Sequence, residues 1–216
     1  MELRITSTTY EGKERITREQ TIPFCDDAGR EDQLINLYPQ VTYQRMDGFG
    51  GAITDSAAYI YSLMNPEQKK QMLGEYFGQG KMKFRFVRIP IDSCDFSLSH
   101  YEADGDEADE LGGPNHVKNF CDAPYLFDTA RKQLVERELQ SYIKHFSHYI
   151  ETGAIRIGVS RYTDKLEITA FQKNSKIVFV LLNRTQEEIP ALIRLNDTCA
   201  GLIAAPNSIA TGVVNI

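Results

Sequence analysis

The sequence has no tryptophan, only four cysteines, and no apolar run near the roughly 20 residues that a membrane-spanning helix requires. Acidic residues outnumber basic ones, 30 against 24, and the formal net charge is −6. Because nucleic acids and anionic membrane surfaces are bound through basic patches, this balance argues against both as partners. Residues 1–7 contain no apolar stretch of the kind found in secretory signals. The default expectation is therefore an intracellular protein with no membrane span.

The cysteines lie far apart and form no C-x-x-C pair, which favours free, buried thiols in a reducing compartment. They are Cys25, Cys94, Cys121 and Cys199. Of the four histidines, only His145 and His148 share helical spacing, and no third ligand is near them in sequence, so no metal site is predicted. Asn183 and Asn196 each begin a glycosylation acceptor pattern, which without export is read as ordinary loop sequence.

Other motifs that often carry chemistry have simpler explanations here. The run Gly48-Phe-Gly-Gly51 is too short for a dinucleotide fingerprint. It predicts instead a tight strand-to-helix turn where the backbone comes close to a ligand or to another strand. The acidic stretch 102–110 does not fit a calcium-binding EF-hand, because its glycine and last glutamate fall at the wrong offsets. No Ser-His-Asp or Cys-His set can be assembled. The residues thus indicate no cofactor.

Residues 41–150 alternate between strand and helix patterns, which predicts βα units around a parallel sheet. Thr54 or Asp55 can cap a helix that runs through Met64. A second helix begins at Asn65-Pro-Glu and stops at Gly78, and a buried strand is expected over 84–91. A third helix, 139–150, is closed by Thr152-Gly153.

From residue 154 onward the apolar residues alternate with polar ones, which is typical of β-strands. Five or six short strands at roughly ten-residue spacing predict an antiparallel sandwich or barrel over 154–214. We expect strands from the polar N-terminal segment to join it. The expected inward-facing set is Ile157, Ile168, Val178, Val180 and Leu182.

Arg88 and Asp95 follow the carboxyl end of a predicted parallel strand, where α/β barrels keep their active sites. An arginine and a carboxylate in this place suit bidentate hydrogen bonds to a ring that carries several hydroxyls. A structural ion pair between the two side chains is the alternative on residue type alone.

Several blocks of the sequence resemble glycoside hydrolase family 30, the glucosylceramidase-like retaining β-glycosidases. Residues 47–55, 88–97 and 112–124 are similar to parts of that family's active-site region. Residues 145–158 and 180–185 are similar to the family's β-sandwich and the segment leading into it. The resemblance implies a (β/α)₈ barrel beside a β-sandwich, and a β-linked glycan or glycolipid as partner. It implies no cofactor and no metal, and relatives of this family are often secreted or lysosomal.

The same resemblance suggests which residues contact the substrate. Arg88 and Asp95 fall on family positions that contact the innermost sugar, and Asn119, after the eighth barrel strand, falls on a third. His116 falls on a position where relatives often carry an aromatic or polar residue at the rim of the active site. The implied activity is hydrolysis of β-glucosides or glucosylceramide-type lipids.

The catalytic residues of the family have no counterpart. A retaining glycosidase needs two carboxyls about 5–5.5 Å apart. The family's acid/base glutamate stands in an Asn-Glu-Pro setting, which does not occur here, and its nucleophile lies in a stretch of barrel that residues 98–111 replace. The lack of tryptophan agrees, because sugar sites commonly stack rings on aromatics. No catalytic residue is therefore predicted, and a non-catalytic β-sandwich or carbohydrate-contacting remnant is the alternative function.

We therefore predict an α/β plus all-β chain: a partial TIM (β/α) barrel that keeps strands one, two and eight, followed by a C-terminal antiparallel β-sandwich. The predicted limits are 1–40 for N-terminal strands that pack on the sandwich, 41–153 for the truncated barrel, and 154–216 for the sandwich. Residues 98–115 show no helical pattern and are expected to be irregular. An open three-stranded sheet leaves unprotected edges, through which the chain can associate with a partner.

Overall fold

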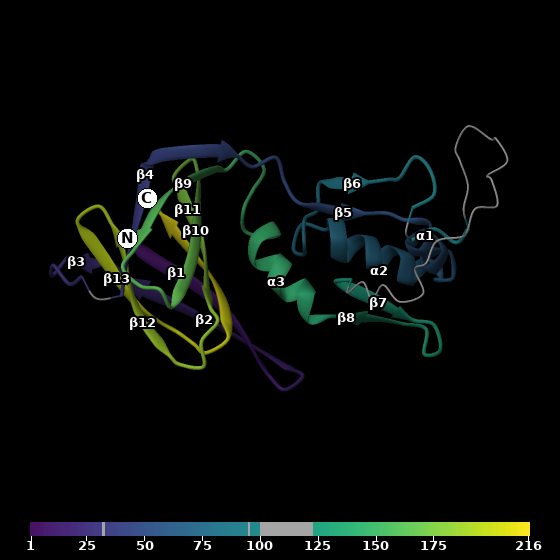
Figure 1. Cartoon of the computed structure of the whole chain (residues 1–216), viewed down its shortest axis with the longest axis horizontal. Coiled ribbons are helices and arrows are strands. Elements are labelled where there is room, and N and C mark those ends of the chain that lie inside the picture. Colours follow the sequence, from purple (N-terminus) through teal and green to yellow (C-terminus); the bar gives the residue numbers. More distant parts are fainter. Residues whose placement is uncertain (32, 95, 100–122) are drawn as a thin grey trace. The chain divides into compact units, whose positions relative to one another are not determined.

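The computed structural model describes residues 1–31, 33–94, 96–99 and 123–216. The chain forms two compact units (Figure 1). The sheet unit comprises Met1–Gly48 and Ser141–Ile216, and the inserted unit comprises Phe49–Gln140. These limits differ from those read from the sequence, because the long strand that leaves the N-terminal segment and the helix that returns from the inserted unit both extend the sheet unit.

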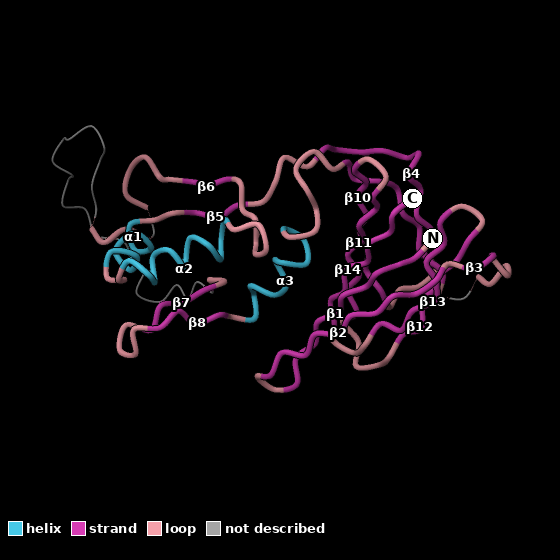
Figure 2. Tube along the Cα trace, turned by 180° about the vertical axis from the view of Figure 1, so that it is seen from behind, coloured by secondary structure: helices cyan, strands magenta, loops and turns pink. Residues whose placement is uncertain are grey.

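Ten strands form one sheet in the order β2-β1-β14-β11-β10-β9-β4-β12-β13-β3. All neighbours are antiparallel except β4 and β12, which are parallel. Strand β13 also contacts β2, so the sheet curls until its two ends approach each other. The tube view in Figure 2 shows the N-terminal strands lying among the C-terminal ones. The strands are β1 (Glu2–Glu11), β2 (Glu14–Pro23), β3 (Cys25–Asp26), β4 (Leu34–Arg45), β9 (Ile155–Arg161), β10 (Leu166–Lys173), β11 (Lys176–Asn183), β12 (Ile189–Leu195), β13 (Thr198–Ala204) and β14 (Ser208–Asn215).

The concave side of this sheet holds one hydrophobic core, to which most of its strands contribute. Phe179 of β11 is fully buried in it, and its ring occupies the space beside Gly212 of β14. A Cβ atom on Gly212 would lie 2.1 Å from Cζ of Phe179, so the glycine is what admits the ring. The alternation along 154–214 therefore does specify an antiparallel sheet with a buried face.

The prediction of which β11 residues face this core is wrong by one residue. Ile177, Phe179 and Leu181 point into it, whereas Val178 and Val180 are buried on the opposite face. Leu182 is only half-buried. The error has a physical cause: β11 is apolar on both faces, so its sequence does not alternate and cannot indicate a register. Elsewhere the expected set holds, because Ile157 lies in the core and Ile168 packs against it.

The helix α3 (Glu138–Ser147) is fastened to the second face of the sheet by a buried histidine. His145 lies with its Nδ1 2.8 Å from Oγ1 of Thr211 on β14 and its Nε2 3.0 Å from Oγ1 of Thr8 on β1. Thr211 in turn donates to the His145 carbonyl oxygen at 3.0 Å. Burial, and secondarily the charge of Lys144, lower the pKa of His145 to about 4. The ring is therefore neutral in the folded protein near neutral pH.

Asn183 is the hydrogen-bonding centre of the turn that follows β11. Its Nδ2 donates to the carbonyl oxygens of Glu187, Ala204 and Ala205 at 2.8–3.1 Å. Its Oδ1 accepts from the backbone N–H and the hydroxyl of Thr185. Only 1% of the residue is exposed. The acceptor pattern that begins at Asn183 is thus a structural turn, whereas Asn196 stands exposed between β12 and β13 with a φ of 53°.

Replacing Asn183 with alanine should destabilise the sheet unit by about 1–3 kcal/mol, because buried carbonyl oxygens would lose their donor. Chemical denaturation followed by far-ultraviolet circular dichroism measures the change. Asn215→Ala is a matched control, since that side chain is exposed and its backbone is extended in β14. Equal losses in the two variants would contradict the assigned role of Asn183.

The inserted unit begins with a βαα segment that follows its local sequence signals closely. Thr54 caps the first helix by accepting from the Ala57 N–H. Asn65 caps the second and forms a reciprocal capping box with Gln68. Both helices therefore begin where the sequence predicts, and the second ends at Gly78. The elements of the unit are β5 (Gly50–Ala52), α1 (Asp55–Ser62), α2 (Pro66–Phe77), β6 (Phe86–Arg88), β7 (Tyr125–Asp128) and β8 (Gln133–Glu136). No helix among the described residues is long and apolar enough to cross a membrane.

The prediction of a buried strand over 84–91 is wrong for most of its length. Only Phe86–Arg88 forms a strand, and Phe86 and Val87 are about half exposed. Ile89 and Ile91 are 66% and 83% exposed. The composition is that of a strand covered on both faces, but within the described residues β6 pairs with β5 alone. The apolar pattern is thus that of a strand with neighbours on both faces, which the described residues of this unit do not supply.

The prediction of buried cysteines also needs correction. Cys25 is exposed, and Cys94 and Cys199 are half-buried. All three are free thiols, and Cys121 lies outside the described residues. Cys25 is exposed because β3, only two residues long, lies at the end of the sheet order with β13 as its partner.

Candidate functional site

The parallel strands β5 and β6 bring two separate parts of the chain to one edge. Gly50 is paired with Phe86 and Ala52 with Arg88. A Cβ atom on Gly50 would lie 2.2 Å from the carbonyl oxygen of Phe86, so only glycine allows this approach. The expectation that the glycine run lets the backbone come close to another strand is thereby confirmed. Because parallel strands end at the same edge, the segments that follow β5 and β6 emerge together.

Hydrogen bonds hold these two segments against each other. The Ile53 N–H donates to the Arg88 carbonyl oxygen at 2.8 Å. Ser56, in the first turn of α1, donates to the Phe96 carbonyl oxygen through its N–H at 2.9 Å and its hydroxyl at 2.6 Å. Buried Ser97 accepts from the Cys94 N–H at 2.9 Å and closes the turn after β6. The strand-end edge is therefore a built structure and not two unrelated loops.

Of the residues predicted to contact sugar, the structure places one. Arg88 is the last residue of β6, exposed, at the edge just described. Asp95, Asn119 and the rim candidate His116 lie outside the described residues. The structure thus brings Arg88 to the edge at which the sequence places it, and its clustering with Asp95 and Asn119 stays a prediction.

Sequence reasoning did not single out Ser56 or Asp92, and it considered Asp55 only as a helix cap. Ser56 joins α1 to the segment after β6, and the signal for it was its position in a capped helix directly after a strand. Asp55 opens α1 at the end of β5, and Asp92 is an exposed carboxylate four residues after Arg88. Both carboxylates therefore follow the ends of the paired strands. Within the described residues, His, Cys, Asp and Glu form no group of three or more that could hold a metal ion.

A second polar group in the inserted unit has a structural role. The Tyr125 hydroxyl donates to Oε2 of Glu75 at 2.8 Å, and Nζ of Lys81 lies 2.9 Å from Oε1 of Glu75. Burial, followed by the neighbouring Glu75, raises the pKa of Tyr125 above its usual value. The Tyr125 ring also packs edge-on against Tyr76. Since Glu75 is occupied by a phenol and an ammonium group, it fastens β7 to α2 and is not poised for acid/base chemistry.

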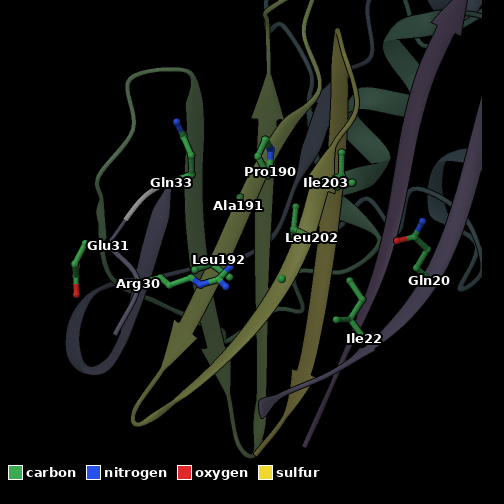
Figure 3. Close-up of a pocket in the computed structure, with 11 residues that line it drawn as sticks. Gln20, Ile22, Arg30, Glu31, Gln33, Pro190, Ala191, Leu192, Leu202 and Ile203 are labelled. Carbon is green, nitrogen blue, oxygen red and sulfur yellow. The ribbon is translucent and has the colours of Figure 1, made fainter. Parts of the chain in front are cut away.

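The sheet unit carries a hollow of about 940 Å³ on β2, β12 and β13, and Arg30, Glu31 and Gln33 also line it. Figure 3 shows its lining side chains spread along these strands, with Arg30 and Glu31 at one end and Gln20 and Ile22 at the other. Its lining includes Leu192 and Ile203 but no aromatic residue. An open, unstacked surface of this kind offers a sugar ring little to hold it.

Two segments of the chain match domain families of one enzyme class. Residues 46–111 match the glycosyl hydrolase family 30 TIM-barrel domain, and residues 153–212 match the glycosyl hydrolase family 30 beta sandwich domain. The barrel match includes Arg88 and ends before residues 112–124, a block that resembles another part of the family's active-site region. The sandwich match covers β9 to β13 and most of β14.

Similar curated proteins agree with this assignment. Mouse lysosomal acid glucosylceramidase is 37% identical over 68 residues, which are 32% of this chain and 13% of that protein. Putative glucosylceramidase 1 of Caenorhabditis elegans is 39% identical over 79 residues, 35% of this chain and 15% of that protein. The aligned part of the chain thus spans less than a sixth of the length of either relative.

Solved structures show the fold. SrfJ from Salmonella typhimurium superposes with a TM-score of 0.88 at 15% identity, with 100% of both chains covered. The endo-β1,6-glucanase BT3312 gives a TM-score of 0.74 at 12% identity, with 99% of both chains covered. At these identities the likeness supports the arrangement of strands and helices and says nothing about substrate.

Proposed function

We propose, from the premise that this chain belongs to glycosyl hydrolase family 30, that it contacts a β-linked glycan or glycolipid through the end of β6 and does not hydrolyse it. The observation that carries this proposal is the placement of Arg88 at the shared carboxyl edge of the parallel strands β5 and β6, inside the segment that matches the family's TIM-barrel domain. The family and the glucosylceramidase relatives point to a β-glucoside or a glucosylceramide-type lipid as the substrate class.

The chemistry explains why binding without turnover is proposed. Hydrolysis with retention of the configuration at the anomeric carbon requires two carboxyl groups about 5–5.5 Å apart. One acts as acid and base, and the other acts as nucleophile. The sequence has no Asn-Glu-Pro tripeptide in which the family's acid/base residue stands. Among the described carboxylates of the inserted unit, Glu75 is bound to Tyr125 and Lys81. A guanidinium group at the strand end suits sugar hydroxyls, but it performs neither of the two carboxylate roles.

The finer architecture belongs to the same proposal. We assign β5 and β6 as barrel strands one and two, and the sequence that we expect to keep strand eight lies outside the described residues. Exposed apolar residues at β6 and beyond it support an open barrel, since Phe86, Val87, Ile89 and Ile91 would be covered by neighbouring βα units in a closed one. No described strand pairs with the second edge of β6, and we expect the chain to associate with a further strand-bearing partner through this edge.

A non-catalytic remnant, in which only the sheet unit is functional, is the second candidate. Its support is the complete hydrophobic core of that unit, built from strands at both ends of the sequence. The two candidates differ in one respect: the first requires Arg88 for sugar binding, and the second does not.

The purified chain should not hydrolyse an aryl β-glucoside above the rate of the buffer blank. Release of the aryl alcohol, followed by absorbance over hours at high protein concentration, is the measurement. The residues to test if turnover does appear are Glu102, Glu107 and Glu110, each changed to glutamine. Turnover that any one of these changes abolishes would show that a catalytic carboxylate has survived in the shortened segment.

Binding is tested separately, by titrating methyl β-glucoside into isotopically labelled protein and following amide shifts. We expect weak, saturable shifts in residues near the end of β6 that Arg88→Ala removes. Arg184→Ala is a matched control, because Arg184 is also an exposed arginine but lies in the sheet unit. Saturable binding that survives Arg88→Ala would favour the second candidate.

A further inference from the structure

Two cysteines distant in sequence lie opposite each other at the end of the ten-stranded sheet. Strand β3 pairs with β13 in antiparallel register, and Cys25 is the direct partner of Cys199. Side chains of directly opposed residues in an antiparallel pair leave the sheet on the same side and lie close together. We infer that Cys25 and Cys199 are a redox-active pair, which a small-molecule disulfide converts into a cross-strand disulfide bond.

The backbone geometry suits such a bond. The Asp27 N–H donates to the Asp197 carbonyl oxygen at 3.1 Å, two residues along from the cysteine pair. Because hydrogen-bonded and non-bonded positions alternate, Cys25 and Cys199 also occupy a hydrogen-bonded position, where the Cα atoms lie ~5.5 Å apart. Disulfides span Cα separations of roughly 4.4–6.8 Å. Opposed Cβ atoms at such a position lie up to ~5.5 Å apart, whereas a disulfide spans ~3.5–4.5 Å between Cβ atoms. The bond thus requires side-chain rotation and a shift of about 1 Å between the strands, which the two-residue length of β3 permits.

The surroundings give the two thiols different roles. Cys25 is exposed and open to a reagent, whereas Cys199 is half-buried. The Cys199 thiol donates to Oδ1 of Asp27 at 3.4 Å, and Oδ2 of Asp27 is paired with Nε of Arg194 at 2.6 Å. Burial, and then the hydrogen bond to Asp27, raise the pKa of the Cys199 thiol. The exposed Cys25 is therefore the thiol that a reagent meets first, and Cys199 acts second.

The reaction consumes one molecule of oxidised glutathione or a similar disulfide. The Cys25 thiolate attacks one sulfur of the reagent, forms a mixed disulfide and releases one glutathione thiolate, which takes up a proton. The Cys199 thiol then loses its proton to solvent, and its sulfur attacks the Cys25 sulfur and expels the second glutathione. Two protein thiols are oxidised and one external disulfide is reduced to two thiols, so electrons and protons balance.

The bond would secure the weakest strand of the sheet. In the described part of the chain β3 is two residues long and pairs with β13 alone. Linking Cys25 to Cys199 closes a loop of most of the chain, and long loops lose the most unfolded-state entropy on closure. The oxidised protein should therefore unfold at a higher temperature than the reduced protein. This inference does not depend on the proposed sugar-binding function.

The test uses the full chain, reduced and then exposed to oxidised glutathione. Non-reducing peptide mass spectrometry should show a linked pair containing Cys25 and Cys199, which dithiothreitol separates. The melting temperature should rise by several degrees on oxidation. Cys25→Ser and Cys199→Ser should each abolish both effects, and Cys94→Ser should retain them. Stable glutathione adducts on Cys25 without the link, or links only to Cys94 or Cys121, would overturn the inference.

Discussion

Replacing Phe179 with alanine should lower the free energy of unfolding of the sheet unit by about 3–5 kcal/mol, a substantial part of the total stability of a typical domain. The side chain is fully buried between strands of the core, and its ring fills the space that Gly212 leaves open. Truncation removes this apolar surface from the core and leaves a cavity that the flanking strands can close only in part.

Urea unfolding followed by far-ultraviolet circular dichroism measures this effect, since the chain has no tryptophan to report it by fluorescence. Ile203→Ala is the matched control, because Ile203 is 66% exposed and its truncation creates no buried cavity. Gly212→Ala tests overpacking, because the added methyl group would clash with the Phe179 ring. It should lower the free energy of unfolding by about 1–3 kcal/mol. In a Phe179→Ala background the same change should cost much less, because the ring is gone. Equal losses for Phe179→Ala and Ile203→Ala would refute the packing.

Acidification should destabilise the sheet unit through His145. The pKa of this ring is lowered from 6.5 to about 4 by burial and by Lys144, so the unfolded chain binds a proton at a higher pH than the folded one. Stability is therefore unaffected by this group above pH 6.5 and falls as the pH drops from about 6.5 towards 4. The loss should reach up to about 3 kcal/mol.

The change His145→Gln isolates this contribution, because carboxylates also titrate in the lower part of the window. Glutamine can still bridge Thr8 and Thr211, but it does not titrate. We expect the variant to lose less stability than the parent between pH 6.5 and 4.5. His148→Gln is a control of the same residue type, also near the end of α3. Identical pH profiles for His145→Gln and the parent would show that the ring is not held neutral by its surroundings.

Local signals predicted local structure well. The Thr54 and Asn65 caps lie within the first turns they stabilise, so no knowledge of distant residues was needed to place α1 and α2. The inward face of β11 could not be chosen, because both faces of this strand are apolar and both are buried. The expected burial of residues 84–91 failed for a related reason. An apolar run indicates side chains that are stable when buried, but it does not indicate which residues pack against them.

In the candidate site, too, local sequence signals predicted some features and not others. The approach of Gly50 to β6 and the position of Arg88 at the strand end follow from the turn and strand signals around them. Asp95 and Asn119 were assigned only by resemblance to a family, since no periodicity links them to Arg88. The hydrogen bonds from Ser56 to Phe96 join residues 40 positions apart, and nothing in the sequence marks such a pair.

The pairing of β1 with β14 bears on when the protein can fold. Strand β1 spans residues 2–11 and its partner β14 spans residues 208–215, so about 200 residues separate the two. A ribosome that has synthesised β1, β2 and β4 has therefore supplied less than half of the core, and the inserted unit must emerge before the partners of those strands do. Contacts so distant in sequence close slowly. The edge of β1 that pairs with β14 therefore stays unpaired during translation until β14, eight residues long, has been synthesised.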